Sequence, residues 1–307
     1  IVFLLLLVVS NVTNRFLPQL PLPLVQIVLG ISLGFILPQE KFHLDTELFL
    51  ALVIGPLLFR EAEESNITSI FKHWRIVLYL IFPVIFISTV GLGYLAHLLW
   101  GALPLAACVA VGAALGPTDL VAFASLSERF SFPKRVENIL KGEGLLNDAS
   151  GLVAFRVALL AWTTGSFSLG KASISLVLSI IGGFAIGMLS AGLNRWLHKL
   201  LMSAQVSDIA SELLLELSLP LVTFFLAEEI HVSGIIAVVV AGIFKASRFK
   251  RITLLEAQVD SVTETIWNTV NFMLNGSVFI ILGMELEMIA EPILKSPIYD
   301  NLLLLVS

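Results

Sequence analysis

Apolar stretches of bilayer length recur along this chain, and they constrain its fold more than any other feature. Of its 307 residues, 57% are hydrophobic and only 13% are charged, compared with about 25% charged residues in a soluble domain. The mean hydropathy of +0.97 excludes a soluble protein with a large core. Because runs of about 20 apolar residues are typical of membrane-spanning helices, we predict an all-α polytopic membrane protein.

These runs divide the chain into about eleven predicted helices. In chain order they cover residues 1–10, 21–37, 47–63, 75–100, 103–127, 136–163, 169–198, 208–229, 232–246 and 258–289, with a further segment from about 298. Since the chain begins and ends in apolar runs, we expect a single transmembrane domain, 1–307, that is truncated at its C-terminal end. No basic segment or small-residue cleavage site precedes the first run, which argues against a cleavable signal peptide.

Lysine and arginine are distributed unevenly between the predicted loops. Every second loop, starting with the first, holds basic residues: Arg15, Lys72, Arg75, Arg129, Lys134, Arg135, Arg195, Lys199, Lys245, Arg248, Lys250 and Arg251. The opposite loops hold Lys41, Lys171 and Lys295. Because cytoplasmic loops carry the excess of positive charge, the first set is predicted to be cytoplasmic in a multi-pass protein of the cell membrane.

A polar insertion interrupts the sixth predicted helix. Residues 142–151 read Gly-Glu-Gly-Leu-Leu-Asn-Asp-Ala-Ser-Gly, so Glu143, Asn147 and Asp148 enter a membrane helix. A carboxylate at the bilayer centre costs roughly 2.5–3.5 kcal/mol, and a chain that keeps one there is expected to use it. Arg156 is about two turns beyond Asp148. Because desolvation disfavours a charged carboxylate, Asp148 is the candidate for exchanging a proton for a cation.

The neighbours of Asp148 have two interpretations each. Glu143 lies nearer the cytoplasmic end of the predicted helix, where it is either a structural acid that awaits a basic partner or part of the site. Asn147 is four residues from Glu143, on the same helix face, and is either an ion ligand or an orienting donor. A purely structural role for Asp148 is the less favoured reading.

A helix break is predicted upstream, where residues 116–119 read Gly-Pro-Thr-Asp. Pro117 removes a backbone donor and disfavours helical conformation at Gly116. Broken helices at bilayer depth mark ion sites, because half-helix ends carry partial charges and free carbonyls. Thr118 and Asp119 would begin the second half-helix, where Asp119 either caps the N-terminus and offsets its dipole or contacts an ion.

The remaining polar and small residues have structural interpretations. Residues 60–64, Arg-Glu-Ala-Glu-Glu, are interpreted as a solvated or snorkelling cluster, and Glu228 and Glu229 as a solvated helix edge. Arg156 is expected to pair with an unidentified acid on another helix. Small residues at every fourth position predict close helix packing, within the protomer or at a subunit interface: Gly112 and Gly116 on one helix, and Gly183, Gly187 and Ala191 on another.

The polar motifs, in their order, resemble those of the NhaP/NHE-type monovalent cation/proton antiporters, the sodium/hydrogen exchangers. The similarity begins with residues 116–119, 133–135 and 142–149. It continues in Leu-Ala-Glu-Glu at 226–229, Val-Ser-Gly-Ile-Ile-Ala-Val-Val-Val-Ala-Gly at 232–242, and Asn275 through Leu286. It therefore extends over nearly the whole chain.

The resemblance implies an NhaA-like inverted-repeat fold of about thirteen helices, of which about eleven are present here. Residues 75–164 would form the first half of the ion-transport core. Residues 1–74 and 165–295 would supply scaffold and dimerisation helices of a homodimer.

The resemblance also implies roles for the polar residues. Asp148 and Asn147 would bind the ion, Thr118 would offer a ligand to Na⁺, and Glu143 would pair with an arginine on a later helix. Two positions depart from the family. Gly144 stands where the family often has serine and removes a hydroxyl ligand, and Arg60 stands where relatives often have an acid.

The implied activity is secondary active exchange of Na⁺, or another monovalent cation, for H⁺ by alternating access, which serves pH homeostasis. Na⁺ and H⁺ would compete for Asp148 in the lipid bilayer, with no enzymatic reaction, resident cofactor or nucleic-acid partner. One alternative is K⁺/H⁺ antiport on the same scaffold. Another is an intramembrane aspartyl protease, since two acids on adjacent helices can share a proton, although Pro-Thr-Asp and Leu-Asn-Asp differ from the Tyr-Asp and Gly-x-Gly-Asp of such enzymes.

Overall fold

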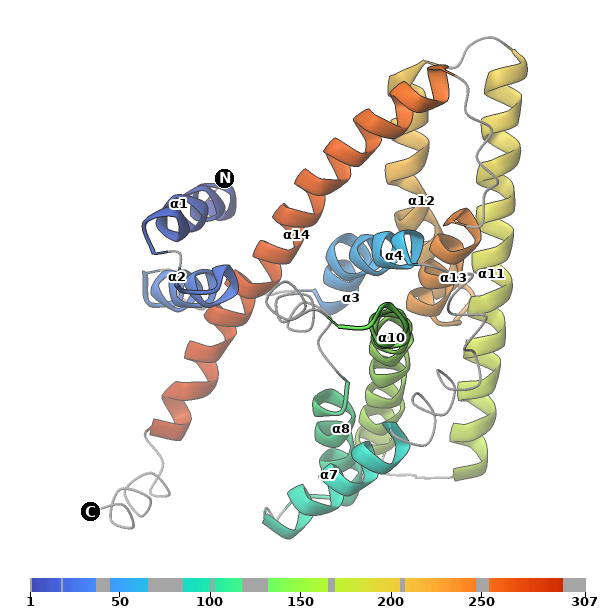
Figure 1. Ribbon diagram of the computed structural model, residues 1–307. Helices are drawn as coiled ribbons and strands as arrows, with labels where there is room; N and C mark the ends of the chain where they lie inside the picture. The colour runs from blue at the N-terminus through green and yellow to red at the C-terminus, as the bar shows by residue number, and fades with distance from the viewer. Residues whose placement is uncertain are drawn as a thin grey trace. The chain divides into compact units, whose positions relative to one another are not determined.

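The computed structural model describes residues 2–17, 19–36, 45–65, 85–99, 101, 103–117, 132–164, 169–204, 208–246 and 254–294. Parts of α10, α11 and α14, among them 145–150, are described by their backbone alone. Within the described residues all regular secondary structure is helical (Figure 1). The predicted all-α class is confirmed for this part of the chain.

The helices follow the predicted apolar runs closely. They are α1 Val2–Phe16, α2 Leu22–Ile36, α3 Thr46–Phe49, the π-helical turn η2 Leu50–Ile54, α4 Gly55–Glu64, α7 Ile85–Leu99, α8 Leu105–Leu115, α10 Lys134–Thr164, α11 Leu169–Ser203, α12 Ile209–Glu229, α13 Gly234–Ala246 and α14 Leu254–Leu294. Three stretches in the described part have the length and hydropathy of a membrane span, namely Leu178–Ser203, Ile209–Glu229 and Ser261–Leu286. The segment predicted from about 298 lies outside the described residues.

Three predicted helix ends were placed too early. Helix α1 continues to Phe16 rather than ending at residue 10, α11 continues to Ser203 rather than 198, and α14 continues to Leu294 rather than 289. Arg195 and Lys199 were predicted in a loop and lie in α11 instead. Polar side chains end an apolar run, but they leave the backbone hydrogen bonds of the helix intact, so helix and apolar run need not end together.

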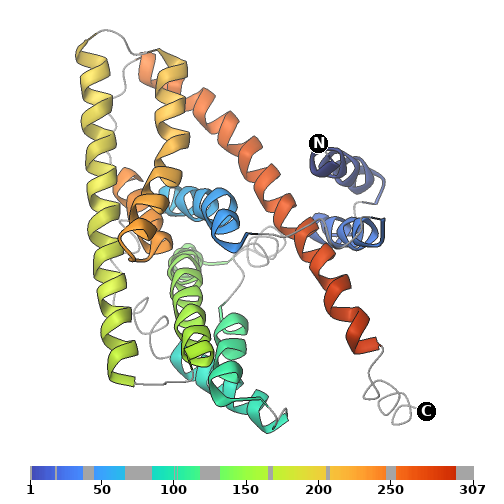
Figure 2. The same ribbon diagram turned by 180° about the vertical axis from the view of Figure 1, so that it is seen from behind.

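The chain packs as two compact units, one of Ile1–Leu57 with Thr253–Ser307 and one of Leu58–Ile252. In the first unit, α2 crosses α14 where Gly30 and Gly283 meet (Figures 1 and 2). A Cβ on Gly30 would lie 2.2 Å from the carbonyl oxygen of Ile280, and one on Gly283 would lie 2.2 Å from that of Ile27. Only glycine allows two helices to approach this closely.

In the second unit, α7 packs on α8, α8 on α10, and α11 on α13. Here the small residues predicted at every fourth position pack against other helices of the same chain. A Cβ on Gly112 would lie 2.2 Å from the carbonyl oxygen of Thr89, and one on Gly187 would lie 2.3 Å from that of Ala237. The prediction of packing within the protomer is confirmed for these two glycines.

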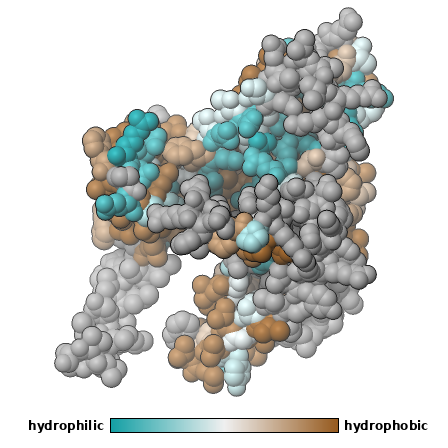
Figure 3. Space-filling view, viewed as in Figure 1, coloured by the Kyte–Doolittle hydropathy of each residue, from teal (hydrophilic) through white to brown (hydrophobic). Residues whose placement is uncertain are grey.

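The outward side chains of the second unit include many apolar ones. Figure 3 shows apolar residues over α7 and α8, where Tyr94, Leu95, Leu98, Leu99 and Leu105 are exposed. Exposed apolar surface of this kind marks a region that another apolar phase covers, as expected for helices in lipid.

A tight turn joins α12 to α13 and positions several polar groups. His231 has a φ of 58°, in the left-handed region. The N–H of His231 donates to the carbonyl of Glu228 at 2.9 Å, and the N–H of Val232 donates to that of Ala227 at 3.0 Å. This pair of bonds is a Schellman motif. Ser233 then caps α13, since its Oγ accepts the N–H of Ile236 at 3.3 Å.

Candidate functional site

The predicted helix break lies where α8 ends. Helix α8 stops at Leu115, with Gly116 as its C-cap, directly before Pro117. The helix predicted over 103–127 therefore ends before Pro117, as expected. The prediction that Pro117 disfavours helical conformation at Gly116 was wrong, because Gly116 has a φ of −73° and a ψ of −38°. Thr118 and Asp119, the residues predicted to follow the break, lie outside the described residues.

The polar insertion at 142–151 lies within the long helix α10, which is continuous from Lys134 to Thr164. Glu143 and Gly144 are buried. Asn147 and Asp148 are helical in their backbone, and their side chains lie outside the described part of the structure. Insertion of these polar residues therefore does not break the helix.

The two predicted parts of the site are brought together by a contact between α10 and α8. A Cβ built on Gly151 would lie 2.3 Å from Cγ of Pro117 and 3.5 Å from the carbonyl oxygen of Ala113. Gly151 lies about one turn beyond Asp148. The end of α8 therefore lies against the segment of α10 that carries Asn147 and Asp148.

Arg156 forms an ion pair with an acidic residue of α12. Its Nη1 lies 2.9 Å from Oε1 of Glu228, so the prediction that Arg156 pairs with an acid on another helix is confirmed. The same Oε1 accepts the N–H of Gly234 at 3.1 Å. The prediction that Glu228 is a solvated edge residue was wrong, because its side chain is 18% exposed and joins two other elements. Its neighbour Glu229 is exposed, as predicted.

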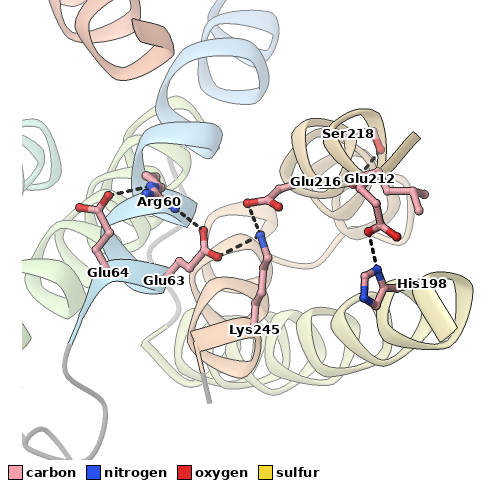
Figure 4. Close-up of polar contacts among 9 residues, drawn as sticks. Arg60, Glu63, Glu64, His198, Glu212, Glu216, Ser218 and Lys245 are labelled. Atoms are coloured by element: carbon pink, nitrogen blue, oxygen red, sulfur yellow. Dashed lines mark hydrogen bonds and ion pairs between the residues drawn. The ribbon is translucent and has the colours of Figure 1, made fainter. Parts of the chain in front are cut away.

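A network of charges links α4, α12 and α13 at their adjacent ends (Figure 4). Lys245 Nζ lies 2.9 Å from Glu63 Oε1 and 2.5 Å from Glu216 Oε1. Arg60 reaches Glu63 at 3.0 Å and Glu64 at 2.7 Å. Only Glu64 is well exposed, at 54%, whereas the side chains of Arg60, Glu63, Glu216 and Lys245 are 10–16% exposed.

The interpretation of residues 60–64 as a solvated or snorkelling cluster was therefore wrong for Arg60 and Glu63, whose side chains are largely buried. Glu63 binds Lys245 of α13, and Gly242 of the same helix approaches the carbonyl oxygen of Phe59 so closely that a Cβ would lie 2.5 Å from it. Lys245, predicted in a loop, lies in the last turn of α13. The spacing of Gly242 and Lys245 was the available signal, since residues three apart share a helix face.

A second ionisable pair lies on the neighbouring hairpin. His198 of α11 contacts Glu212 of α12 through its Nδ1 (Figure 4). Glu212 is buried. In the described ranges no three His, Cys, Asp or Glu residues are arranged to hold a metal ion.

The chain is similar to known proteins along nearly its whole length. The profile of the family described as "Sodium/hydrogen exchanger, transmembrane" matches residues 1–306. A sodium, potassium, lithium and rubidium/H⁺ antiporter of Bacillus subtilis (strain 168) is 38% identical over 302 residues, which are 98% of this chain and 45% of that protein. An uncharacterised Na⁺/H⁺ exchanger of Escherichia coli (strain K12), YjcE, is 34% identical over 298 residues, 95% of this chain and 53% of that protein. The chain thus spans about half the length of these relatives.

The fold is also similar to that of a solved antiporter. The structure of the sodium proton antiporter MjNhaP1 from Methanocaldococcus jannaschii at pH 8 matches 92% of this chain and 69% of its own, with a TM-score of 0.71. The sequence identity is 19%, so this likeness concerns the fold alone.

Proposed function

Because the chain belongs to the sodium/hydrogen exchanger family, we propose that it exchanges Na⁺ or another monovalent cation for H⁺ by alternating access, with Asp148 as the exchanging carboxylate. It acts as a transporter and not as a protease. The observation that carries the proposal is the contact between Gly151 and Pro117, which brings a helix break against the helix segment that carries Asp148.

The chemistry follows from the groups available to a desolvated cation. A carboxylate in a low-dielectric site is stabilised either by a proton or by a cation, and it accommodates only one of them well. In each transport cycle, Asp148 therefore carries Na⁺ when the site moves in one direction and H⁺ when it moves in the other. One carboxylate that carries one charge suits an exchange of one cation for one proton.

Oxygen ligands are supplied by the neighbours of Asp148. Asn147 offers an amide oxygen and Thr118 a hydroxyl, both suited to a hard cation. Carbonyl groups freed at Gly116–Pro117 add further oxygen atoms, and Asp119 offsets the dipole of the half-helix that follows. At Gly144, which lacks a side chain, a backbone carbonyl or a water molecule replaces the hydroxyl that family members often have.

The cation preference extends beyond Na⁺ in this proposal. The Bacillus subtilis relative is named for sodium, potassium, lithium and rubidium, and that breadth motivates K⁺/H⁺ exchange as a second activity of the same site. Competition of K⁺, Li⁺ and Rb⁺ against Na⁺-driven proton flux separates a broad site from a sodium-selective one.

The proposed architecture follows the family. Residues 75–164 form the first half of the moving core, and 1–74 and 165–295 form scaffold and dimerisation helices of a homodimer in the cell membrane. The predicted topology has Glu63, His198, Glu212 and Lys245 on one side, and the contacts of Lys245 with Glu63 and of His198 with Glu212 support this part of the proposal. That side is proposed to be cytoplasmic.

The decisive experiment compares the wild-type full-length protein with Asp148→Asn in proteoliposomes under an imposed pH gradient. Asn keeps the size of the side chain and removes the titrating charge. We expect Na⁺-driven proton flux in the wild type and none above background in the variant. Flux retained by Asp148→Asn would refute the assignment of the exchanging group.

A further inference from the structure

An ion pair joins the helix that carries Asp148 to the turn between α12 and α13. Nη1 of Arg156 lies 2.9 Å from Oε1 of Glu228. We propose that this pair is a latch, which holds α10 against the α12–α13 turn in the conformation described above and opens when α10 moves during transport. The latch rests on the proposed function, because it requires alternating access.

Glu228 is the fixed half of the latch. Its Oε1 also accepts the N–H of Gly234, the first residue of α13, at 3.1 Å, where the positive end of the helix dipole favours a carboxylate. The Schellman motif ties the backbone of Glu228 to His231 at 2.9 Å. The carboxylate therefore stays in place whether Arg156 is present or not.

Arg156 is the movable half. Its side chain is 37% exposed, whereas that of Glu228 is 18% exposed. When the pair opens, the carboxylate of Glu228, the less exposed of the two groups, keeps its bond to Gly234. Opening thus does not leave this carboxylate without any partner, which is what makes the rupture of buried ion pairs costly. The pair can open and close repeatedly.

The position of Arg156 couples the latch to the site. Arg156 lies about two turns beyond Asp148 on a continuous helix, so a displacement of Asp148 displaces Arg156 as well. Helix α10 belongs to the proposed core and Glu228 to the proposed scaffold. Any movement of core against scaffold therefore changes the distance between Arg156 and Glu228.

The charge network around Lys245 provides a contrast. Its members Arg60, Glu63, Glu216 and Lys245 all belong to segments of the proposed scaffold, 1–74 and 165–295. Movement of the core does not require this network to open. The network around Lys245 is therefore expected to stay intact during transport, whereas the pair of Arg156 and Glu228 joins the proposed core to the proposed scaffold.

The first test measures transport from both sides of the membrane. A latch stabilises one of the two transport conformations, so its loss shifts the population towards the other conformation. The apparent KM for Na⁺ measured from one side of the membrane then changes by a different factor from the KM measured from the opposite side. In proteoliposomes of the full-length protein, Glu228→Gln and Arg156→Gln are each expected to change the ratio of the two KM values by about threefold or more, in the same direction. The double variant is expected to go no further, because directly contacting residues act as a unit.

The chain offers a matched control for this measurement. Glu229→Gln changes the exposed acid next to Glu228 and is expected to leave the ratio unchanged. Glu228→Gln retains an oxygen for the N–H of Gly234, so it removes the pair with little effect on the turn. An unchanged ratio in Glu228→Gln and Arg156→Gln would overturn the latch, because a purely structural pair lowers stability without favouring one side.

The second test locks the pair covalently. In a Cys108→Ser background, Arg156→Cys combined with Glu228→Cys is joined by a short bifunctional thiol reagent that a reductant can cleave. We expect exchange before cross-linking, none after it, and recovery on reduction. Exchange that persists in the cross-linked protein overturns the latch alone, whereas absence of exchange in the wild type overturns the antiport proposal with it.

Discussion

Gly151 of α10 lies against Pro117 at the end of α8, with room for a hydrogen atom but not for a methyl group between them. A Cβ on Gly151 would stand 2.3 Å from Cγ of Pro117. The proline ring is rigid, so a larger residue at 151 has to move one helix away from the other. The end of α8 can therefore lie this close to the segment of α10 that carries Asp148 only because residue 151 is glycine.

Gly151→Ala is expected to destabilise the protein by roughly 1–3 kcal/mol, the usual cost of overpacking, and to lower the rate of exchange. Thermal unfolding in detergent and proton flux in proteoliposomes measure the two effects. Gly192→Ala is the control, since a Cβ at Gly192 of α11 meets nothing within 4 Å. Equal behaviour of the two variants would show that the contact with Pro117 is unimportant.

Lys245→Met is expected to destabilise the second unit strongly. It leaves the carboxylates of Glu63 and Glu216, whose side chains are 16% and 15% exposed, without their shared cation. Removing one partner of a buried ion pair costs about 3–5 kcal/mol, measured as a fall in the midpoint of thermal unfolding.

The exposed Lys199 supplies the matched control for Lys245, because Lys199→Met removes the same charge from the surface of α11. Adding Glu63→Gln and Glu216→Gln to Lys245→Met is expected to restore part of the lost stability. If Lys245→Met unfolds at the same temperature as Lys199→Met, the network does not stabilise the fold.

His231→Gly is expected to stabilise the protein by about 1 kcal/mol. His231 adopts a φ of 58°, a left-handed conformation that costs a residue with a Cβ about 1–2 kcal/mol and that glycine adopts freely. The measurement is the midpoint of thermal unfolding. His231→Ala keeps the Cβ and should bring no such gain, so a similar rise in both variants would argue against backbone strain as the cause.

Asp208 is expected to stabilise α12 in a pH-dependent manner. Its Oδ1 accepts the N–H of Ser211 at 3.0 Å, and hydrogen bonds from the side chain and backbone of Ser211 hold the pKa of Asp208 below its ordinary value. A carboxylate with a lowered pKa in the folded state contributes its full stabilisation above its unfolded pKa, about 3.9. The contribution is lost as the pH falls through the folded value.

The melting temperature of Asp208→Ala should therefore lie furthest below that of the wild type at about pH 6 and approach it towards about pH 3. Asp208→Asn, which caps a helix without a charge, serves as the comparison and should show a smaller dependence on pH. A gap between Asp208→Ala and the wild type that widens on acidification would contradict the role of the charge.

Prediction from the sequence succeeded where one segment carries its own signal. Apolar run length located the helices, because a helix that spans lipid must be long and apolar throughout. The end of α8 before Pro117 was predicted correctly, although proline alone does not end a helix, since α12 continues through Pro220. The helix ends at Phe16 and Ser203 were missed, because polar residues there continue a helix outside the apolar run.

Prediction failed where two segments far apart in the chain determine the environment of a side chain. Glu228 and the cluster of Arg60 and Glu63 were assigned to solvent because they lie at helix ends, where charges usually meet water. The partner of Glu228 is Arg156 and that of Glu63 is Lys245, and both lie on other helices, far away in the sequence. The spacing of apolar and polar residues in the sequence predicts which face of a helix is buried, but it does not identify the helix that packs against this face.

The amino-acid sequence by itself determined the all-α class, the positions of most helices, the helix break and the family, since each depends on local composition and order. Only the tertiary structure decided that Gly151 meets Pro117, that Arg156 binds Glu228, and that Lys245 is shared by Glu63 and Glu216. These contacts join segments far apart in the chain, because packing selects partners by shape and charge in space rather than by distance along the chain.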